Sequence, residues 1–220
     1  MTWGECKLIA LQTMFSNEGV DINVDDSNQD YVNAMPGKAN EAMMQLSMVG
    51  RPILKSFRIV IADGTAEAVT EDQLTLPAAE VRYKLDMKTY CPRWRCLEAG
   101  EVYLDSGGIY DKAEDWAMEG TTLLALPGDI TGTYTIWYDA YPQTVTKLTE
   151  DSETLDIPEE AAVLIPVYIA AELYKEDELA LATMLRNEFE DGLNKLRQAW
   201  QETVGYGFRS GAVRNTTGWW

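Results

Sequence analysis

Hydrophobic and polar positions follow two different periods along the chain, and the period changes twice. Up to residue 51, and again after residue 155, apolar residues recur at the three- and four-residue steps of one helical face. Between these regions, apolar and polar residues alternate, as they do in half-buried β-strands. This order predicts an α+β fold in which a sheet segment separates two helical segments.

Two helical stretches are expected before residue 51. Thr2 and Glu5 have the spacing of a capping box, and Asn17-Glu18-Gly19 is a stop signal. The apolar face of this first helix is expected to comprise Leu8, Ile9, Leu11, Met14 and Phe15.

The second stretch opens at Ser27 and Asp30, which repeat the capping-box spacing. Pro36-Gly37 predicts a kink or break, because proline removes a hydrogen-bond donor and clashes with the preceding turn. A further helix should then end at Gly50. The two helical pieces are expected to share one apolar face, formed by Tyr31, Met35, Ala42, Leu46 and Val49.

Short strands separated by turns are expected in the middle of the chain. Turn chemistry occurs at Asp63-Gly64, Ser106-Gly107-Gly108 and Pro127-Gly128-Asp129. Strands at this spacing, without helical crossovers, favour an antiparallel β-sandwich or jelly roll. The strand-like runs lie near residues 57–61, 81–87, 101–104, 122–126 and 133–138.

Helical spacing returns near Asp156. Pro158 and Glu159-Glu160 suit a first helical turn, and Pro166 predicts a kink or a later true start. The expected inward stripe is Leu164, Val167, Ala171 and Tyr174. Lys175-Glu176-Asp177 predicts a tight corner before a last helix. The apolar ridge of that helix comprises Leu181, Leu185, Phe189, Leu193, Leu196 and Trp200.

The last sixteen residues, GYGFRSGAVRNTTGWW, lack periodicity and carry positive charge. They predict an extended C-terminal tail over residues 205–220, rich in the residue types that dominate binding hot spots. The alternatives are a disordered tail or a tail that packs on its own subunit. The candidate binding residues are Tyr206, Phe208, Arg209, Arg214, Trp219 and Trp220.

Neither pair of helices can bury its apolar stripe well alone. We therefore expect a four-helix bundle domain formed by residues 1–51 and 152–204, with a β-sandwich domain, residues 52–151, inserted between them.

Composition argues against several classes of function. The chain has 36 acidic and 18 basic residues, a net charge of −18, which disfavours nucleic acid as a main partner. It has no histidine, so the commonest general base and metal ligand are missing. Carboxylate chemistry remains open, at Glu159-Glu160 or at Glu176-Asp177-Glu178, although helix starts and corners carry solvated acids anyway. We expect no enzyme activity and no cofactor.

Other candidate sites are weak. The acidic loop at Asp21, Asn23 and Asp25 fails the EF-hand pattern, because Asp26 and Val32 stand where glycine and glutamate are needed. Cys91 and Cys96 could pair across a turn, but free thiols are favoured. No run of eighteen apolar residues suggests a membrane span, and the N-terminus lacks the features of a signal peptide. Aromatic residues of the sheet segment are either core or a sugar-binding platform: Trp94, Trp116, Trp137, Tyr103 and Tyr110.

Several segments resemble the head-to-tail adaptor, or connector, proteins of tailed bacteriophages, most closely the podophage type with a sheet domain inserted in a helical bundle. The segments are TWGECKLIALQTMF, DYVNAMPGKANEAMMQL, GTYTIWYDAYPQTV and LDIPEEAAVLIPVYIAAELYKEDELALATMLRNEFEDGLNKL. The most specific pieces are Tyr141-Pro142, the Ile157-Pro158-Glu159-Glu160 helix start and the Leu173-Tyr174-Lys175-Glu176-Asp177 corner.

The resemblance implies a virion structural protein of the neck, assembled in the host cytoplasm as a ring of usually twelve copies. Such a ring binds the portal protein on one side and tail, nozzle or hub proteins on the other, and DNA passes through it without sequence-specific binding. By the same resemblance, residues 205–220 would reach into the portal. The alternative is a tail, baseplate or glycan-binding jelly-roll module of a virion.

Overall fold

The computed structural model describes residues 1–15, 28–62, 65–68, 74–76, 82–114, 116–127 and 130–211. It is a mixed α+β structure with antiparallel sheets. The chain divides into two compact units. The sheet unit comprises residues 52–141, and the helical unit combines residues 1–51 with residues 142–220. No helix of the described segments is long and apolar enough to cross a membrane.

The helical unit begins with α1 (Trp3–Phe15). The predicted capping box is confirmed: the Thr2 N–H donates to Glu5 Oε2 at 2.8 Å, and the Glu5 N–H donates to Thr2 Oγ1 at 3.2 Å. The predicted face is only partly correct. The buried side chains are Trp3, Cys6, Ala10, Leu11 and Met14. Leu8 and Ile9 remain 39% exposed, because the helix turns its Trp3–Cys6–Ala10 stripe to the core.

Helix α2 (Gln29–Ser47) runs unbroken through Pro36, so the predicted break is wrong. Pro36 is itself buried, and buried side chains on both sides of it anchor the helix to the core: Met35, Ala39, Ala42, Met43 and Leu46. This packing offsets the lost hydrogen bond, since tertiary burial supplies most helical stability. Ser27 lies outside the described residues, and Asn28 precedes the helix without a side-chain cap.

The C-terminal helices are α4 (Glu159–Ala162), α5 (Ile165–Leu173) and α6 (Leu179–Gly211). Pro166 lies in the first turn of α5, which confirms the later helix start. The predicted face of α5 is only partly correct: Ala171 is buried, but Leu164, Val167 and Tyr174 are only half-buried. The residues that α5 buries are Ile165, Pro166, Tyr168, Ile169, Ala170 and Ala171.

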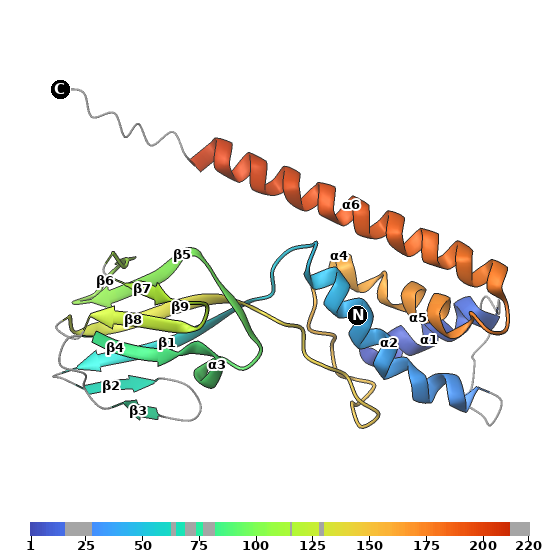
Figure 1. Cartoon of the computed structure of the whole chain (residues 1–220), viewed down its shortest axis with the longest axis horizontal. Coiled ribbons are helices and arrows are strands. Elements are labelled where there is room, and N and C mark those ends of the chain that lie inside the picture. The colour runs from blue at the N-terminus through green and yellow to red at the C-terminus, as the bar shows by residue number, and fades with distance from the viewer. Residues whose placement is uncertain are drawn as a thin grey trace. The chain divides into compact units, whose positions relative to one another are not determined.

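The helix α6 continues to Gly211, so the expectation of an extended tail from residue 205 is wrong for residues 205–211. A helix nucleated upstream adds each further residue at little cost, and glycine at 205 and 207 does not stop it. Figure 1 shows α6 as the longest helix of its unit, running past α4 and α5. Residues 212–220 lie outside the described residues.

The sheet unit contains two antiparallel sheets. Their strands are β1 (Leu54–Ala62), β2 (Thr65–Ala68), β3 (Leu74–Leu76), β4 (Arg82–Asp86), β5 (Trp94–Ser106), β6 (Ile109–Lys112), β7 (Ala117–Glu119), β8 (Leu123–Pro127) and β9 (Gly132–Ala140). The larger sheet has the strand order β3-β2-β1-β9-β5-β6 and the smaller β4-β8-β7 (Figure 1). Between β4 and β5 lies the short helix α3 (Met87–Tyr90).

The predicted alternation at residues 57–61 is confirmed, because Phe57, Ile59 and Ile61 are all buried. They share one core with Leu85 and Leu124 of the smaller sheet. Both glycines of the Ser106-Gly107-Gly108 turn have positive φ, which lets the β5–β6 hairpin turn there. The sheet unit ends at Tyr141 rather than near residue 151 because residues 142–155 bond to the helical unit, through Asn40 and through Trp3 and Gly4.

Candidate functional site

The first half of α6 fixes the helix to its own unit. Ala182, Leu185 and Phe189 are buried, and the Phe189 ring lies 4.8 Å from the ring of Tyr168 on α5. The Arg186 guanidinium lies over both rings, 5.1 Å from Tyr168 and 5.7 Å from Phe189. These contacts give α6 a defined direction as it leaves the core.

A charged network borders this contact. Arg186 Nη1 donates to Glu172 Oε1 at 3.0 Å, and Lys175 Nζ donates to Glu172 Oε2 at 2.6 Å. Burial disfavours the charged form of Glu172, but the Lys175 bond and the nearby cations outweigh it and hold the pKa of Glu172 below its ordinary value. Glu172 is therefore ionised at neutral pH and links α5 to α6 through its ion pair with Arg186. An ionised carboxylate cannot act as a general acid near neutral pH.

Gly192 lets α6 approach the segment between α4 and α5 closely. A Cβ atom at this position would lie 2.6 Å and 2.8 Å from the two Cδ atoms of Leu164. Beyond Gly192, Leu193 and Leu196 are half-buried against the core. The last fully buried side chain of the described part of α6 is Phe189.

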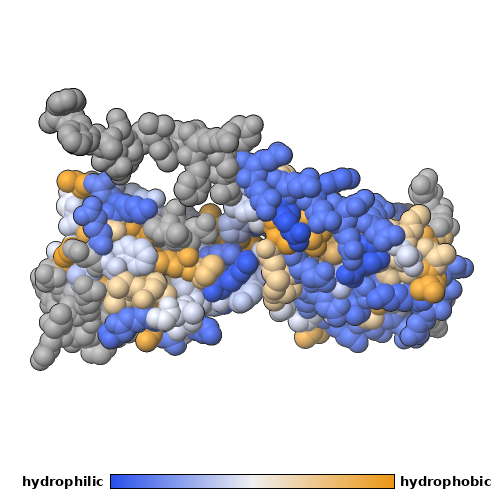
Figure 2. All heavy atoms as spheres, turned by 45° about the horizontal axis from the view of Figure 1, so that its top comes forward, coloured by the Kyte–Doolittle hydropathy of each residue, from blue (hydrophilic) through white to orange (hydrophobic). Residues whose placement is uncertain are grey.

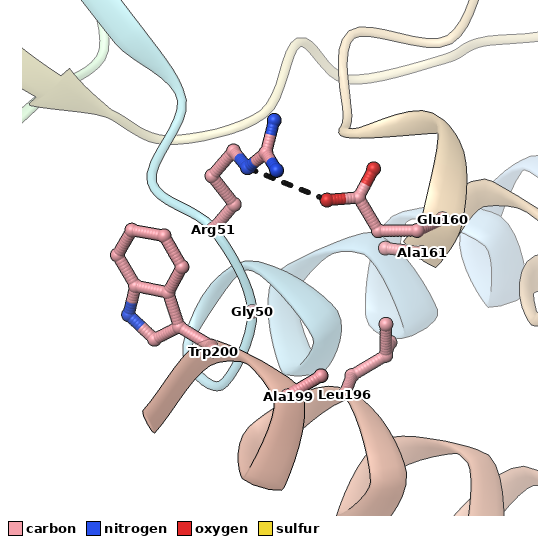
Figure 3. A pocket seen from close by; sticks show the side chains of 7 residues that line it. All are labelled: Gly50, Arg51, Glu160, Ala161, Leu196, Ala199 and Trp200. Atoms are coloured by element: carbon pink, nitrogen blue, oxygen red, sulfur yellow. Dashed lines mark ion pairs between the residues drawn. The ribbon is translucent and has the colours of Figure 1, made fainter. Parts of the chain in front are cut away.

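A small pocket of about 90 Å³ lies where α6 passes the end of α2. Figure 3 shows Trp200 rising from α6 beside the Gly50 turn, while Arg51 and Glu160 face each other. Arg51 Nε and Glu160 Oε1 are 3.5 Å apart. The pocket is lined by Gly50, Arg51, Glu160, Ala161, Leu196, Ala199 and Trp200.

This pocket combines an indole, aliphatic carbons and an exposed ion pair, so its chemistry is that of side-chain binding. Its lining contains no nucleophile paired with a base. Sequence analysis placed Trp200 on the α6 ridge and Glu160 in a helix start, but it did not bring them together. The only sequence signal for this pocket is the Arg51-Pro52 step, which follows α2 and coincides with the boundary between the two units.

The predicted binding residues fall into two groups. Tyr206, Phe208 and Arg209 belong to the last turns of α6, and their side chains lie outside the described part of the structure. Arg214, Trp219 and Trp220 lie wholly outside the described residues. Tyr206, Phe208 and Arg209 therefore have a helical backbone, and their role in binding stays a prediction.

One member of each predicted carboxylate cluster has a partner within the helical unit. Glu160 pairs with Arg51, and Asp177 accepts a hydrogen bond from the Tyr31 hydroxyl. That bond, together with burial, raises the pKa of Tyr31 to about 12. Within the described segments, no group of three histidine, cysteine or carboxylate residues is arranged to hold a metal ion. Asp21, Asn23, Asp25 and Asp26 lie outside the described residues.

None of the three cysteines forms a disulfide, and two of them are shielded from solvent. Cys6 and Cys91 are buried, and burial raises the pKa of each to about 12. Cys96 is exposed. Cys91 and Cys96 therefore do not form the disulfide that sequence analysis left open.

The aromatic residues of the sheet unit are mainly core. Trp94 is 5% exposed, and its indole N–H donates to the Thr121 carbonyl at 3.3 Å. Trp116 packs against the same core, whereas Trp137 on β9 is half-buried. Tyr103 and Tyr110 stack with ring centroids 5.1 Å apart, and Tyr110 is 52% exposed.

Comparison of the chain with protein-family models and with curated proteins finds no match.

Proposed function

We propose that this chain is a structural head-to-tail adaptor of a tailed bacteriophage. Copies of it form a ring beneath the portal, extend the DNA channel and receive tail components on the opposite face. In this proposal the helical unit is a bundle built from both ends of the chain, and the sheet unit is a domain inserted into it. Its role is non-enzymatic, and it uses no cofactor.

The observation that carries the proposal is the length of α6 beyond Phe189, the last fully buried side chain among those that the structure describes in this helix. The helix continues from Phe189 to Gly211, a further distance of about 33 Å at 1.5 Å per residue. A helix of this kind delivers Tyr206, Phe208 and Arg209, and the segment that follows, to a partner. The rigid base formed by Phe189, Tyr168 and Arg186 sets its direction.

Charge supports the same function. A net charge of −18 keeps many copies soluble before assembly, and it suits a channel wall along which DNA slides without adhering. Residues 205–220 carry Arg209 and Arg214 and no acidic residue, in contrast to the rest of the chain. This contrast favours a protein partner for the C-terminal segment.

The proposal is tested by two truncations and a matched surface variant. Deletion of residues 205–220 should abolish binding to the portal protein of the same phage, whereas far-UV circular dichroism should still report a folded helical unit. Deletion of residues 212–220 separates the segment from the end of α6. Tyr110→Ala, which removes an exposed aromatic side chain of the sheet unit, should bind as the unmodified chain does. Normal portal binding by both truncated chains would refute the assignment of the C-terminal segment.

A glycan-binding module is the second candidate, and one observation favours it. Tyr110 and Ile109 are exposed on β6, the edge strand of the larger sheet, beside Tyr103. Exposed aromatic rings can stack on sugars, but Trp94 is buried and cannot take part. Saturable binding on a glycan array, lost in Tyr110→Ala, would favour this candidate over the adaptor.

A further inference from the structure

The helical unit exposes two apolar features, one a protruding turn and the other a hollow. The first is the Leu148 turn, residues 146–149, where Leu148 is 92% exposed. The second is the α1–α4 groove, a hollow of about 320 Å³. Single exposed apolar residues are common on protein surfaces, so neither feature alone requires a partner. The groove is lined by Met1, Glu5, Leu8, Ile9, Glu159 and Val163.

The Leu148 turn is held by its own hydrogen bonds. The Thr146 N–H donates to Thr149 Oγ1 at 2.8 Å, and the Leu148 N–H donates to Thr146 Oγ1 at 3.1 Å. The Thr149 N–H donates to the Thr146 carbonyl at 3.2 Å. Leu148 is therefore presented on a preorganised turn, which lowers the entropic cost of inserting it into a partner.

The segment that carries this turn is anchored on both sides. Before the turn, the Asn40 side chain donates to the Val145 carbonyl and accepts from the Val145 N–H, both at 2.9 Å. After it, the Gly4 N–H donates to the Asp151 carbonyl at 2.9 Å, and Lys7 pairs with the Asp151 carboxylate at 2.6 Å. A Cβ atom on Gly4 would lie 2.9 Å from Asp151 Cβ, so glycine permits this close approach. Figure 1 shows the segment between β9 and α4 turning back on itself.

The groove exposes aliphatic side chains that are not buried in the core of the helical unit. Leu8 and Ile9 are each 39% exposed, and Val163 is 55% exposed. Figure 2 shows small hydrophobic patches on an otherwise mostly hydrophilic helical unit. The Glu5 carboxylate at the rim accepts a hydrogen bond from the Thr2 N–H, but the side chain of Glu159 makes no hydrogen bond or ion pair within the described residues.

The two features carry side chains of opposite charge. Lys147 precedes Leu148 on the turn, is exposed, and likewise has no partner in the described part of the chain. The unpaired ammonium group of Lys147 beside Leu148 is therefore opposite in charge to the unpaired carboxylate of Glu159 in the groove. Pairs of this kind set the register of an interface more than its strength.

The segment that carries the Leu148 turn and the α1–α4 groove involve different faces of α1. Gly4 and Lys7 face the Asp151 segment, whereas Glu5, Leu8 and Ile9 lie about a third of a turn away, at 3.6 residues per turn. Because Leu148 is almost fully exposed, it does not fill the groove of its own chain. A contact between the two features of different copies would therefore be heterologous, the type that generates rings when the rotation closes.

We propose that the Leu148 turn of one copy inserts into the α1–α4 groove of a second copy of this chain, with Lys147 paired to Glu159 at the rim. Only the closure of this contact into a ring rests on the proposed adaptor function. The contact itself is tested without any portal protein.

The experiment uses thiol cross-linking of the full chain in a Cys96→Ser background. Cys6 and Cys91 are buried, so they should not react. Leu148→Cys and Val163→Cys are made on separate chains, mixed and treated with a short thiol–thiol cross-linker. Proximity within the complex should give about tenfold more covalent dimer in the mixture than in either variant alone. A chain carrying both changes should give a ladder of higher oligomers.

Met184→Cys is the matched control, because Met184 is 57% exposed on α6 and does not line the groove. Its mixture with Leu148→Cys should give only background dimer. If the Leu148→Cys and Val163→Cys mixture also stays at background, or if Leu148→Cys alone dimerises equally well, the proposal is overturned. Portal binding by the unmodified chain would still stand in that case, so this failure is distinct from failure of the adaptor function.

A charge exchange tests the rim pair. Lys147→Glu on the Leu148→Cys chain should lower the cross-linked yield about threefold at low salt, the scale expected of an exposed ion pair. Glu159→Lys on the Val163→Cys chain should restore it. An unchanged yield in the first step, or no recovery in the second, would contradict the Lys147–Glu159 pairing.

Discussion

The two units of the chain differ in how their cores are assembled and in what they leave exposed. The core of the sheet unit comes from one continuous stretch, closed by the pairing of β1 with β9. The helical unit draws Trp3, Met43, Tyr168 and Phe189 together from both ends of the sequence. The helical unit also carries the Leu148 turn and the α1–α4 groove. We infer that the sheet unit is self-contained and that the helical unit makes the contacts between copies.

Each unit holds a largely buried carboxyl group with a shifted pKa, and the two shifts have opposite directions. Glu172 of the helical unit has a pKa held below its ordinary value. In the sheet unit, burial raises the pKa of Asp139, and this outweighs the ion pair with Arg95 at 2.9 Å and the hydrogen bond from the Ile53 N–H at 3.0 Å. These two carboxyl groups should therefore contribute to the acid response of their units with opposite signs.

The largest expected effect is that of Phe189→Ala. Phe189 is fully buried, so its truncation should cost the helical unit about 3–5 kcal/mol. Hydrogen exchange should show lost protection in α1, α2 and α5 and unchanged protection in β1 and β9. Ile136→Ala, at a fully buried position of β9, is the matched control and should do the reverse. Equal loss in both units after either change would show that they unfold as one.

Gly192→Ala should cost the helical unit about 1 kcal/mol, because the new methyl group would overlap the Cδ atoms of Leu164. The half-buried Leu164 side chain can shift, and the higher helix propensity of alanine offsets part of the cost. Gly37→Ala is the control, since the helical Gly37 has nothing within 4 Å of a built Cβ atom. It should stabilise α2 by about 0.5–1 kcal/mol. Urea denaturation measures both. A neutral Gly192→Ala would mean that α6 does not depend on this close approach.

Glu172→Gln should cost the helical unit about 1 kcal/mol at neutral pH. Because the folded pKa of Glu172 is lowered, its stabilisation is present above the ordinary value of 4.5 and is lost as pH falls through the folded pKa. The raised pKa of Asp139 acts the other way: its contribution is full below the ordinary value of 3.8 and is lost as pH rises through the folded pKa. Hydrogen exchange between pH 6 and pH 3.5 should therefore show the helical unit weakening, and Glu172→Gln should flatten that slope. The same slope in the variant would remove Glu172 as its cause.

The smallest expected effect on stability is that of Leu148→Ser, within about 0.5 kcal/mol, because the side chain is 92% exposed. Thermal unfolding of the isolated chain measures it. A loss well above this range would mean that Leu148 supports its own chain rather than a neighbouring copy.

Local signals in the sequence predicted well where a few neighbouring residues decide the structure. The Thr2–Glu5 capping box, the alternation of Phe57, Ile59 and Ile61, and the helix start at Pro166 are all of this kind. Long-range packing decided the rest. Pro36 stays helical because buried residues on both sides hold α2, and Leu8 and Ile9 are exposed because Trp3 and Cys6 face the core instead.

The candidate surfaces were harder to predict than the elements that carry them. Trp200, Arg51 and Glu160 meet only after α6 folds back along α5 and α4, and no sequence spacing links them. The Leu148 turn depends on Asn40, more than a hundred residues earlier in the chain. The aromatic and basic composition of residues 205–220 was visible in the sequence, but the helical backbone up to Gly211 was not expected.

Electron microscopy of the full chain mixed with portal rings of the same phage tests the adaptor proposal most directly. The account predicts a second ring, coaxial with the portal and extending its channel, that is missing from portal rings alone and from mixtures with the chain truncated at residue 204. Portal rings that remain bare in the presence of excess full-length chain would contradict it.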